Sequence, residues 1–322
     1  MTRIAFVSCE RIGGIAEDDL IAAEALRARG AEVTAPFWTD ASVDWTAFDA
    51  VVLRSTWDYY LRATEFDAWL GRLSGVNLFN PVATVRWNAD KRYLLELEAR
   101  GVPIVQTRII AKGSAGSAGP AGSAAVPRAP SLSLALAAAI DGFAEAVLKP
   151  SISAGAHQTV RLGGAAGLSG LAAERALAEV LAGSDALVQP YLPEVARAGE
   201  WSVCFLGGVF SHAVLKRPAA GDFRTQQQFG ARAEPLAPPA EVLAAATRAL
   251  AASGQETLYA RVDGVVSQDR FLLMELELIE PCLYFGNDRA AAERFATVLL
   301  AAGRGAGSSH DPACRSGRGP FV

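Results

Sequence analysis

The sequence predicts an α/β protein, and three observations support this fold class. Apolar strand-like runs alternate with segments of helical spacing over residues 3–79, which is typical of a parallel sheet. The chain has 322 residues, 51% hydrophobic and 20% charged, so it can bury a large core and form two or three lobes. Two apolar runs within 259–285 predict a β-hairpin whose second strand alternates glutamates with apolar residues.

Composition and charge argue against several classes of function. The net charge of −4 gives no indication of nucleic-acid binding. No charge-free apolar stretch of about 18 residues predicts a membrane span, and the first residues lack a basic region followed by an apolar signal core. The four cysteines are scattered without CxxC spacing, which is typical of a reduced protein. We therefore expect a cytoplasmic protein without nucleic-acid or membrane partners.

The expected elements follow in order along the chain. The strands of the N-terminal part lie at 3–8, 31–36, 50–53 and 76–79. The helices between and after them lie at 17–29, 64–73 and 88–100. Further strands are expected at 102–110, 143–150, 186–192, 200–206 and 209–216. Further helices are expected at 132–140, 171–181, 239–252 and 290–302.

Two polar residues follow the third expected strand directly. Arg54 and Asp58 lie just past its carboxyl end, and ligands of parallel sheets gather at such ends. Both residues are therefore candidates for substrate contact. A capping and salt-bridge role explains them equally well, and the sequence leaves the two interpretations open.

The hairpin carries three carboxylates that could meet on one face. Glu275 and Glu277 share a parity, so their side chains project from the same side of a strand. Asp263 joins them if the hairpin loop has an odd number of residues, and an even loop places it on the opposite face. Carboxylates gathered on one face would suit Mg²⁺. A solvated face of an antiparallel sheet is the alternative interpretation.

Lysines are rare in this chain. Of the 30 lysines and arginines only four are lysines, and they are Lys91, Lys112, Lys149 and Lys216. A compact, flexible ammonium suits phosphate binding, so each lysine is a candidate phosphate ligand. Retention by chance is the alternative for each of them.

The order of these motifs resembles the ATP-grasp superfamily, of the glutathione-synthetase and ribosomal-modification ligase type. The closest resemblance is to the cyclo-ligases that form D-cycloserine from O-ureidoserine. It is carried, over residues 3–302, by the motifs DWTAFDAVVLRSTWDY, RWNADKRYLLELEARGVPIV, VLKP, VQPYL, FSHAVLK and MELELIEP. Many members of the broader superfamily have Glu-x-Asn where this chain has Glu275-x-Glu277.

The resemblance implies a role for each residue that matches a family motif. The residues implied to bind the nucleotide are Lys91 and Lys149 at the phosphates, Ser153, Ala154 and Gly155 in the loop over the phosphates, Gln189, Tyr191 and Leu192 at the adenine hinge, and Glu200 at the ribose. The residues implied to bind two Mg²⁺ ions, or Mn²⁺ instead, are Asp263, Glu275 and Glu277. Arg217 with Lys216 is implied to stabilise the transferring phosphoryl group, and Arg224 to bind the substrate carboxylate.

The resemblance also implies the reaction and the organisation of the chain. A small carboxylate or amino-acid substrate would attack ATP to give an acyl phosphate, and an amine would then form the amide, within one molecule or between two. The alternatives are a phosphotransferase that acts on a hydroxyl group and an ATP-binding protein without catalysis. A homodimer is the commonest assembly for a soluble enzyme. The expected domains are 1–87, 88–192 with a flexible insertion at 113–130, 193–302, and a disordered tail at 303–322.

Overall fold

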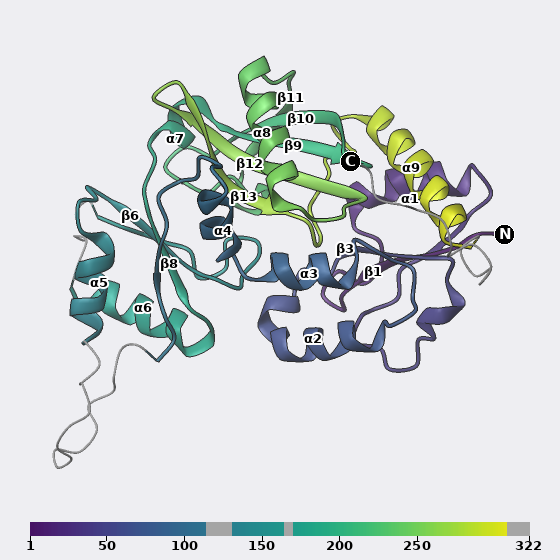
Figure 1. Ribbon diagram of the computed structural model, residues 1–322, viewed down its shortest axis with the longest axis horizontal. Coiled ribbons are helices and arrows are strands. Elements are labelled where there is room, and N and C mark those ends of the chain that lie inside the picture. The colour runs from purple at the N-terminus through teal and green to yellow at the C-terminus, as the bar shows by residue number, and fades with distance from the viewer. Residues whose placement is uncertain (114–130, 164–169, 308–322) are drawn as a thin grey trace, which may run out of the picture.

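A computed structural model describes residues 1–113, 131–163 and 170–307, and these residues form three sheets with helices packed on them (Figure 1). The first sheet is parallel throughout, in the order β2-β1-β3-β4, as the alternation of strands and helices predicted. Its strands are β1 Arg3–Ser8, β2 Glu32–Thr34, β3 Ala50–Ser55 and β4 Leu78–Phe79. The helices in this part of the chain are α1 Glu17–Arg27, α2 Ala63–Arg72 and α3 Val82–Ala89.

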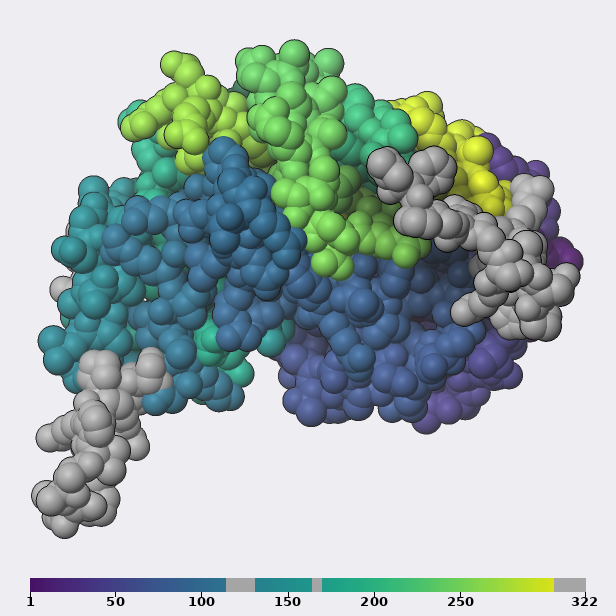
Figure 2. Space-filling view, in the orientation of Figure 1, coloured from purple at the N-terminus to yellow at the C-terminus, as the bar shows by residue number. Residues whose placement is uncertain are grey.

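The middle of the chain forms a separate antiparallel sheet in the order β5-β8-β6-β7. Its strands are β5 Arg108–Ile110, β6 Ala146–Pro150, β7 Val160–Leu162 and β8 Ala186–Pro190. Helices α5 (Leu132–Ile140) and α6 (Leu171–Gly183) bury their apolar faces against it in a small core of their own. Figure 2 shows this lobe, in teal, at one end of the molecule. The insertion expected at 113–130 lies, except for its first residue, outside the described residues.

The third sheet is antiparallel and has five strands in the order β11-β10-β9-β12-β13. Its strands are β9 Glu200–Leu206, β10 Val209–Arg217, β11 Arg232–Pro235, β12 Tyr259–Ser267 and β13 Arg270–Glu277. One face packs on α8 (Ala240–Ser253) and α4 (Tyr93–Ala99), and α7 (Glu194–Ala198) precedes the sheet. The opposite face of β12 and β13 carries the charged residues Arg261, Asp263, Glu275 and Glu277.

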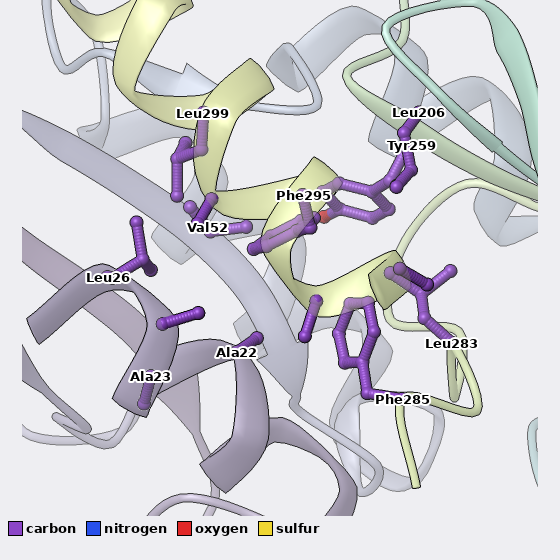
Figure 3. Packing of buried hydrophobic residues seen from close by; sticks show 14 of the residues in the cluster. Ala22, Ala23, Leu26, Val52, Leu206, Tyr259, Leu283, Phe285, Phe295 and Leu299 are labelled. Carbon is purple, nitrogen blue, oxygen red and sulfur yellow. The ribbon is translucent and has the colours of Figure 1, made fainter. Parts of the chain in front are cut away.

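The last helix, α9 (Arg289–Gly307), brings the C-terminal part of the described chain against the N-terminal sheet. It packs beside α1 on one face of the first sheet (Figure 1). In Figure 3, Phe295 and Leu299 of α9 lie with Leu26 of α1, Val52 of β3 and Phe285 in one buried cluster. The first sheet and the C-terminal part of the chain therefore share a core.

Several elements differ from those expected. The helix expected at 88–100 is split, because Asp90 is extended (φ −108°, ψ 116°) between α3 and α4. The strand expected at 102–110 is reduced to β5. The chain also forms α7, β7 and β11, which the sequence did not predict. The expected tail begins too early, since α9 continues to Gly307 and extending a formed helix is easier than starting one; residues 308–322 lie outside the described residues.

None of the helices in the described ranges is long and apolar enough to cross a membrane.

Candidate active site

A cavity of about 470 Å³ lies where the three sheets meet. Every sheet or its connecting segments contribute to its lining. Trp57 and Tyr60 follow β3, Lys149 lies on β6, Glu200 on β9 and Glu275 on β13. The cavity is therefore assembled from segments far apart in the sequence.

The turn of the β12–β13 hairpin settles which loop length the chain uses. Ser267 pairs with Arg270, so the loop is the two residues Gln268 and Asp269, both with positive φ (49° and 59°). Such a turn matches the twist of a two-residue hairpin. An even loop by itself would have placed Asp263 opposite the two glutamates.

A β-bulge reverses that expectation. Gly264 pairs with Leu273, but the preceding residue Asp263 pairs with Glu275, so Met274 is the extra residue. Because one added residue changes the parity of the pairing, Asp263 lies on the same face as both glutamates. The rule that an even loop separates these carboxylates is therefore wrong for this hairpin.

Asp263 is the most enclosed of these carboxylates. Its side chain accepts hydrogen bonds from the Ser202 hydroxyl (2.6 Å) and from Lys216 Nζ (3.1 Å). Lys216 Nζ also donates to Glu200 (2.6 Å), whose second oxygen accepts from the Thr225 hydroxyl (2.6 Å). Burial opposes the charge of Asp263, but the neighbouring cations outweigh it and hold the pKa of that carboxyl well below its usual range.

Arg261 is a central residue of the cavity that the sequence analysis missed. Its guanidinium bonds to Asp263 (Nη2 to Oδ2, 2.8 Å) and forms an ion pair with Glu277. It also donates from Nη1 to the carbonyl of Cys282 (2.9 Å). The signal was present, because Arg261 and Asp263 lie two residues apart on one strand and must share a face.

Two lysines from different elements converge on Glu275. Lys91 Nζ lies 2.9 Å from the Glu275 carboxylate, and it also donates to the carbonyl of Ser153. Burial raises the pKa of Glu275, but Lys91 and Lys149 more than offset this and the net shift is downward. Burial lowers the pKa of Lys149, which makes no ion pair within the described residues. Its ammonium is therefore available to a ligand.

Glu277 lies where negative charge is only partly balanced. Burial raises its pKa to about 8, and the repulsion of Asp263 and Glu275 adds to that shift, although Arg261 opposes it. A further cation in this part of the cavity would relieve the repulsion. The three carboxylates are thus neutralised only in part by the side chains around them.

The small-residue loop after β6 forms one edge of the cavity. Ser153, Ala154 and Gly155 all line it, as expected from their place in the sequence. Gly155 has a positive φ of 60°, and its carbonyl accepts a hydrogen bond from Gln228 Nε2 (2.8 Å). The loop is therefore in contact with the β10–β11 connection across the cavity edge.

The segment after β8 lines the cavity as well. Gln189, Tyr191 and Leu192 all contribute to the lining. The Gln189 amide donates to the Thr107 hydroxyl (2.9 Å), and the Tyr191 ring lies under the guanidinium of Arg161 (3.7 Å to the centroid). These contacts fix the conformation of the segment and leave its backbone beside the cavity.

The two candidate substrate residues at the end of β3, Arg54 on the strand and Asp58 after it, lie outside the cavity lining. Arg54 is 1% exposed and forms an ion pair with Asp19 (2.7 Å). It also donates to the carbonyl of Pro281 (2.9 Å), while Asp58 accepts from the Trp38 indole (2.8 Å). The substrate role is therefore corrected: Arg54 and Asp58 serve the salt-bridge and packing role that the sequence left open.

Arg217 and Arg224 are the two candidate arginines on and after β10, and the predicted position of Arg217 in the site is also corrected. Arg217 is exposed and does not line the cavity, because it follows the cavity-facing Lys216 on the same strand and so points to the other face. Arg224 does line the cavity. It pairs with Asp222 (2.8 Å) and its guanidinium stacks on Phe229 (3.5 Å), which limits its reach.

Asp263, Glu275 and Glu277 form an acidic face of the hairpin, and its fit to a metal ion depends on which of these carboxylates are accessible. The side chains of Glu275 and Glu277 are 26% and 29% exposed, whereas that of Asp263 is 3% exposed and saturated with donors. In the described parts of the chain, no three His, Cys, Asp or Glu side chains are arranged to hold one ion together. The donor set thus fits a hard cation through two glutamates, and the expected three-carboxylate site is not formed in this arrangement.

Comparison with known proteins agrees with this architecture. Residues 4–80 match the family model described as "D-cycloserine synthetase DcsG, N-terminal domain". The cycloserine biosynthesis protein DcsG of Streptomyces lavendulae is 35% identical over 297 residues, which cover 86% of this chain and 90% of that protein. The crystal structure of D-cycloserine synthetase DcsG superimposes with a TM-score of 0.78 at 31% identity, covering 94% of this chain and 99% of that one.

A more distant match shows the fold alone. D-alanine–D-alanine ligase from Bacillus anthracis, solved as a complex with ATP, has a TM-score of 0.62 at 15% identity and covers 95% of this chain and 99% of that one. The fold and the lysine-and-carboxylate cavity thus define an ATP-grasp ligase, an enzyme that forms a C–N bond at the expense of ATP. Within that class, the chain belongs to the family of the D-cycloserine synthetase DcsG. The expected superfamily, and the group of closest resemblance, are confirmed.

Proposed function

We propose that this cavity binds ATP and Mg²⁺ and activates the carboxylate of a small amino-acid derivative for intramolecular amide formation. Lys91 and Lys149 bind the phosphates, beneath the loop of Ser153, Ala154 and Gly155. The nucleotide base lies against the segment formed by Gln189, Tyr191 and Leu192. Glu200 lies at the ribose.

The convergence of Lys91 and Lys149 on Glu275 carries this proposal. The two ammonium groups come from different elements, the α3–α4 connection and β6, and the one on Lys149 makes no ion pair within the described residues. Burying an unpaired ammonium is unfavourable unless an anion joins it. A phosphate chain bound between the lysines and a glutamate-held cation would satisfy all of these charges.

Glu275 and Glu277 are the proposed Mg²⁺ ligands. A pair of ions would place a second one near Asp263, which then exchanges part of its ion pairing with Arg261 and Lys216. Bound Mg²⁺ neutralises phosphate charge and orients the phosphoryl group, and Mn²⁺ has similar oxygen chemistry.

The residues of the cavity suit a two-step reaction. The substrate carboxylate attacks the γ-phosphate, so ADP leaves and an acyl phosphate forms. A nitrogen of the same molecule then attacks the acyl carbon, and inorganic phosphate leaves as the amide closes. Lys216 and Arg261 face the cavity and stabilise the negative charge that develops in both steps.

The substrate class comes from the relatives together with the cavity. DcsG is described as a D-cycloserine synthetase, and 35% identity over most of both chains supports a related cyclisation here. O-Ureidoserine, with a carboxylate and a carbamoylated aminooxy nitrogen in one molecule, is the substrate that we propose to test first; ring closure on that nitrogen leaves its carbamoyl group to be removed by water. We also propose a cytoplasmic homodimer and the three lobes 1–87, 88–192 and 193–302 as its functional units.

The experiment is ADP release from Mg²⁺–ATP with O-ureidoserine and a panel of small carboxylates, in the presence and absence of hydroxylamine. A hydroxamate formed with one carboxylate would support the acyl phosphate and identify the donor. ADP release with neither a hydroxamate nor a cyclised amide for any active substrate would contradict it and indicate phosphoryl transfer to a hydroxyl group. Nucleotide binding without ADP release across the panel would indicate a binding protein.

A further inference from the structure

Glu280 differs from the other carboxylates of the cavity in its lack of a counter-ion. The cavity is lined by five acidic residues, which are Glu200, Asp263, Glu275, Glu277 and Glu280. The first four form ion pairs with Lys216, Arg261 or Lys91. Within the described residues, Glu280 forms no ion pair. Its carboxylate therefore faces the cavity without a cation.

The two cations whose charges act on the Glu280 carboxylate, Lys91 and Arg261, are bound to other groups. Lys91 lowers the pKa of Glu280 by its charge, but its ammonium is bound to Glu275 (2.9 Å) and to the carbonyl of Ser153. Arg261 is held by Asp263 and Glu277. Burial dominates and raises the pKa of Glu280 to about 7, so the charges of the protein compensate its ionised form only in part.

The backbone that carries Glu280 is held by hydrogen bonds that three successive carbonyl groups accept. The Trp57 indole donates to the carbonyl of Glu280 (3.0 Å), Arg54 to that of Pro281 (2.9 Å), and Arg261 to that of Cys282 (2.9 Å). The backbone at Glu280 is therefore held in place before a ligand arrives, and preorganised segments bind with a smaller loss of entropy. The buried Arg54–Asp19 pair acquires a role in this way, as a support for the segment.

The side of the cavity around Glu280 suits a small organic cation. Trp57, Tyr59 and Tyr60 from the N-terminal part line the same cavity, and the charge of Glu280 contributes to the raised pKa of Tyr59, after burial. Aromatic rings and a carboxylate together form a favourable environment for an ammonium group.

We propose that Glu280 binds the α-ammonium group of the substrate and makes the enzyme select carboxylates that carry a free amine on the adjacent carbon. This inference rests on the proposed function, because it requires an amino-acid derivative whose carboxylate is activated in this cavity. Glu280 then fixes the α-carbon so that the carboxylate points toward the phosphate-binding lysines. It has no part in proton transfer and holds no metal ion.

The test compares O-ureidoserine with its counterpart that lacks the α-amino group, using ADP release by the wild-type protein and by Glu280→Gln. The wild type should prefer the amine-bearing compound. The substitution removes the charge and keeps the shape, so kcat/KM for O-ureidoserine should fall by about 10-fold to 100-fold, the usual range for a charged hydrogen bond. The value for the des-amino compound, and the KM values for ATP and Mg²⁺, should change little.

Two further variants make the result specific. Glu280→Asp keeps the charge on a shorter side chain and should retain part of the preference for the amine. Glu98→Gln removes an exposed carboxylate on α4, away from the cavity, and should behave as the wild type.

Three outcomes would overturn the assignment, and they are distinguishable. If Glu280→Gln keeps the full preference for the amine, Glu280 does not bind it, although the proposed function stands. If both compounds lose activity equally and the KM for Mg²⁺ rises, Glu280 serves the metal site instead. If the wild type releases no ADP with either compound, the proposed function fails, and the role of Glu280 fails with it.

Discussion

Lys149 is the residue whose substitution tests the phosphate site most directly. Lys149 is half-buried and its ammonium makes no ion pair in the described parts of the chain, so a neutral side chain of similar length should leave the empty protein intact. Lys149→Met should weaken ATP binding at least about tenfold, because one charge-assisted contact to phosphate is lost. Calorimetric titration with a non-hydrolysable ATP analogue measures the Kd.

The matched control for Lys149 is Lys112→Met. Lys112 is exposed, donates to the carbonyl of Gly183 (3.1 Å), and lies outside the cavity. Its variant should bind the analogue as the wild type does. Equal affinities for all three proteins would remove Lys149 from the phosphate site.

A second comparison between single residues is the effect on kcat of replacing Arg261 or Arg217 by lysine. Arg261→Lys keeps the charge but loses the planar fork that contacts Asp263 and Glu277. We expect kcat to fall by about 10² to 10³, whereas Arg217→Lys on the exposed face should leave kcat near the wild-type value. Steady-state assays, together with thermal melting to exclude unfolding, decide between them. The reverse order of effects would restore Arg217 as the catalytic arginine.

At the scale of elements, the bulge in the β12–β13 hairpin brings the acidic face together. Gly264 flanks it, and a Cβ atom there would lie 2.3 Å from the Phe271 ring and 2.6 Å from the carbonyl of Leu272. Both contacts are far below van der Waals distance, and one of them is to backbone. A side chain at this position must therefore displace the strand or the ring.

Gly264→Ala should consequently destabilise the protein by about 1–3 kcal/mol, the usual effect of overpacking a core. A shift of the strands would also disturb the pairing of Asp263 with Glu275 and reduce turnover. Thermal melting measures the first effect and ADP release the second. Gly183→Ala, near the end of α6 with no atom within 4 Å of the added Cβ, is the control and should melt near the wild-type temperature. Equal melting temperatures for the two variants would show that the strand can accommodate the methyl group.

At the scale of the whole molecule, the chain closes on itself, because α9 and the segment before it pack against the first sheet. His212 on β10 takes part in this closure: its Nε2 lies 2.7 Å from the carbonyl of Leu283, in the segment that leads to α9. Burial lowers the pKa of His212, although the hydrogen bond to that carbonyl and the charge of Asp288 oppose the shift. Protonation of the folded protein at this site is therefore unfavourable.

The sign of the resulting pH dependence follows from that lowered pKa. Below the unfolded-state pKa of about 6.5, the unfolded chain takes up a proton that the folded protein resists, so the free energy of unfolding falls as the pH falls. The loss of stability between pH 7.5 and 5.5 should therefore be smaller in His212→Gln than in the wild type. Urea unfolding at the two pH values measures it, and an unchanged difference would contradict a role for His212.

The sequence by itself determined the class of the protein and the composition of its site. Alternation of strands and helices predicted the parallel sheet, and the motifs around Lys91, Lys149 and Glu275 predicted the ATP-grasp fold, since these features are local or follow a fixed order along the chain. Residues of the small loop and of the adenine segment were predicted by the same order, and their roles stay proposals.

Only the tertiary structure decided which of the charged residues meet. The bulge placed Asp263 with Glu275 in spite of an even hairpin loop. The alternation of side chains along the strands turned Arg217 away from the cavity and Arg261 toward it. Arg54 formed a buried ion pair with Asp19 instead of facing the cavity. Glu280 was distinguished only when every other carboxylate of the cavity was found to have a counter-ion. Pairing between distant segments depends on register and packing across the whole fold, which neither the periodicity nor the composition of a segment specifies.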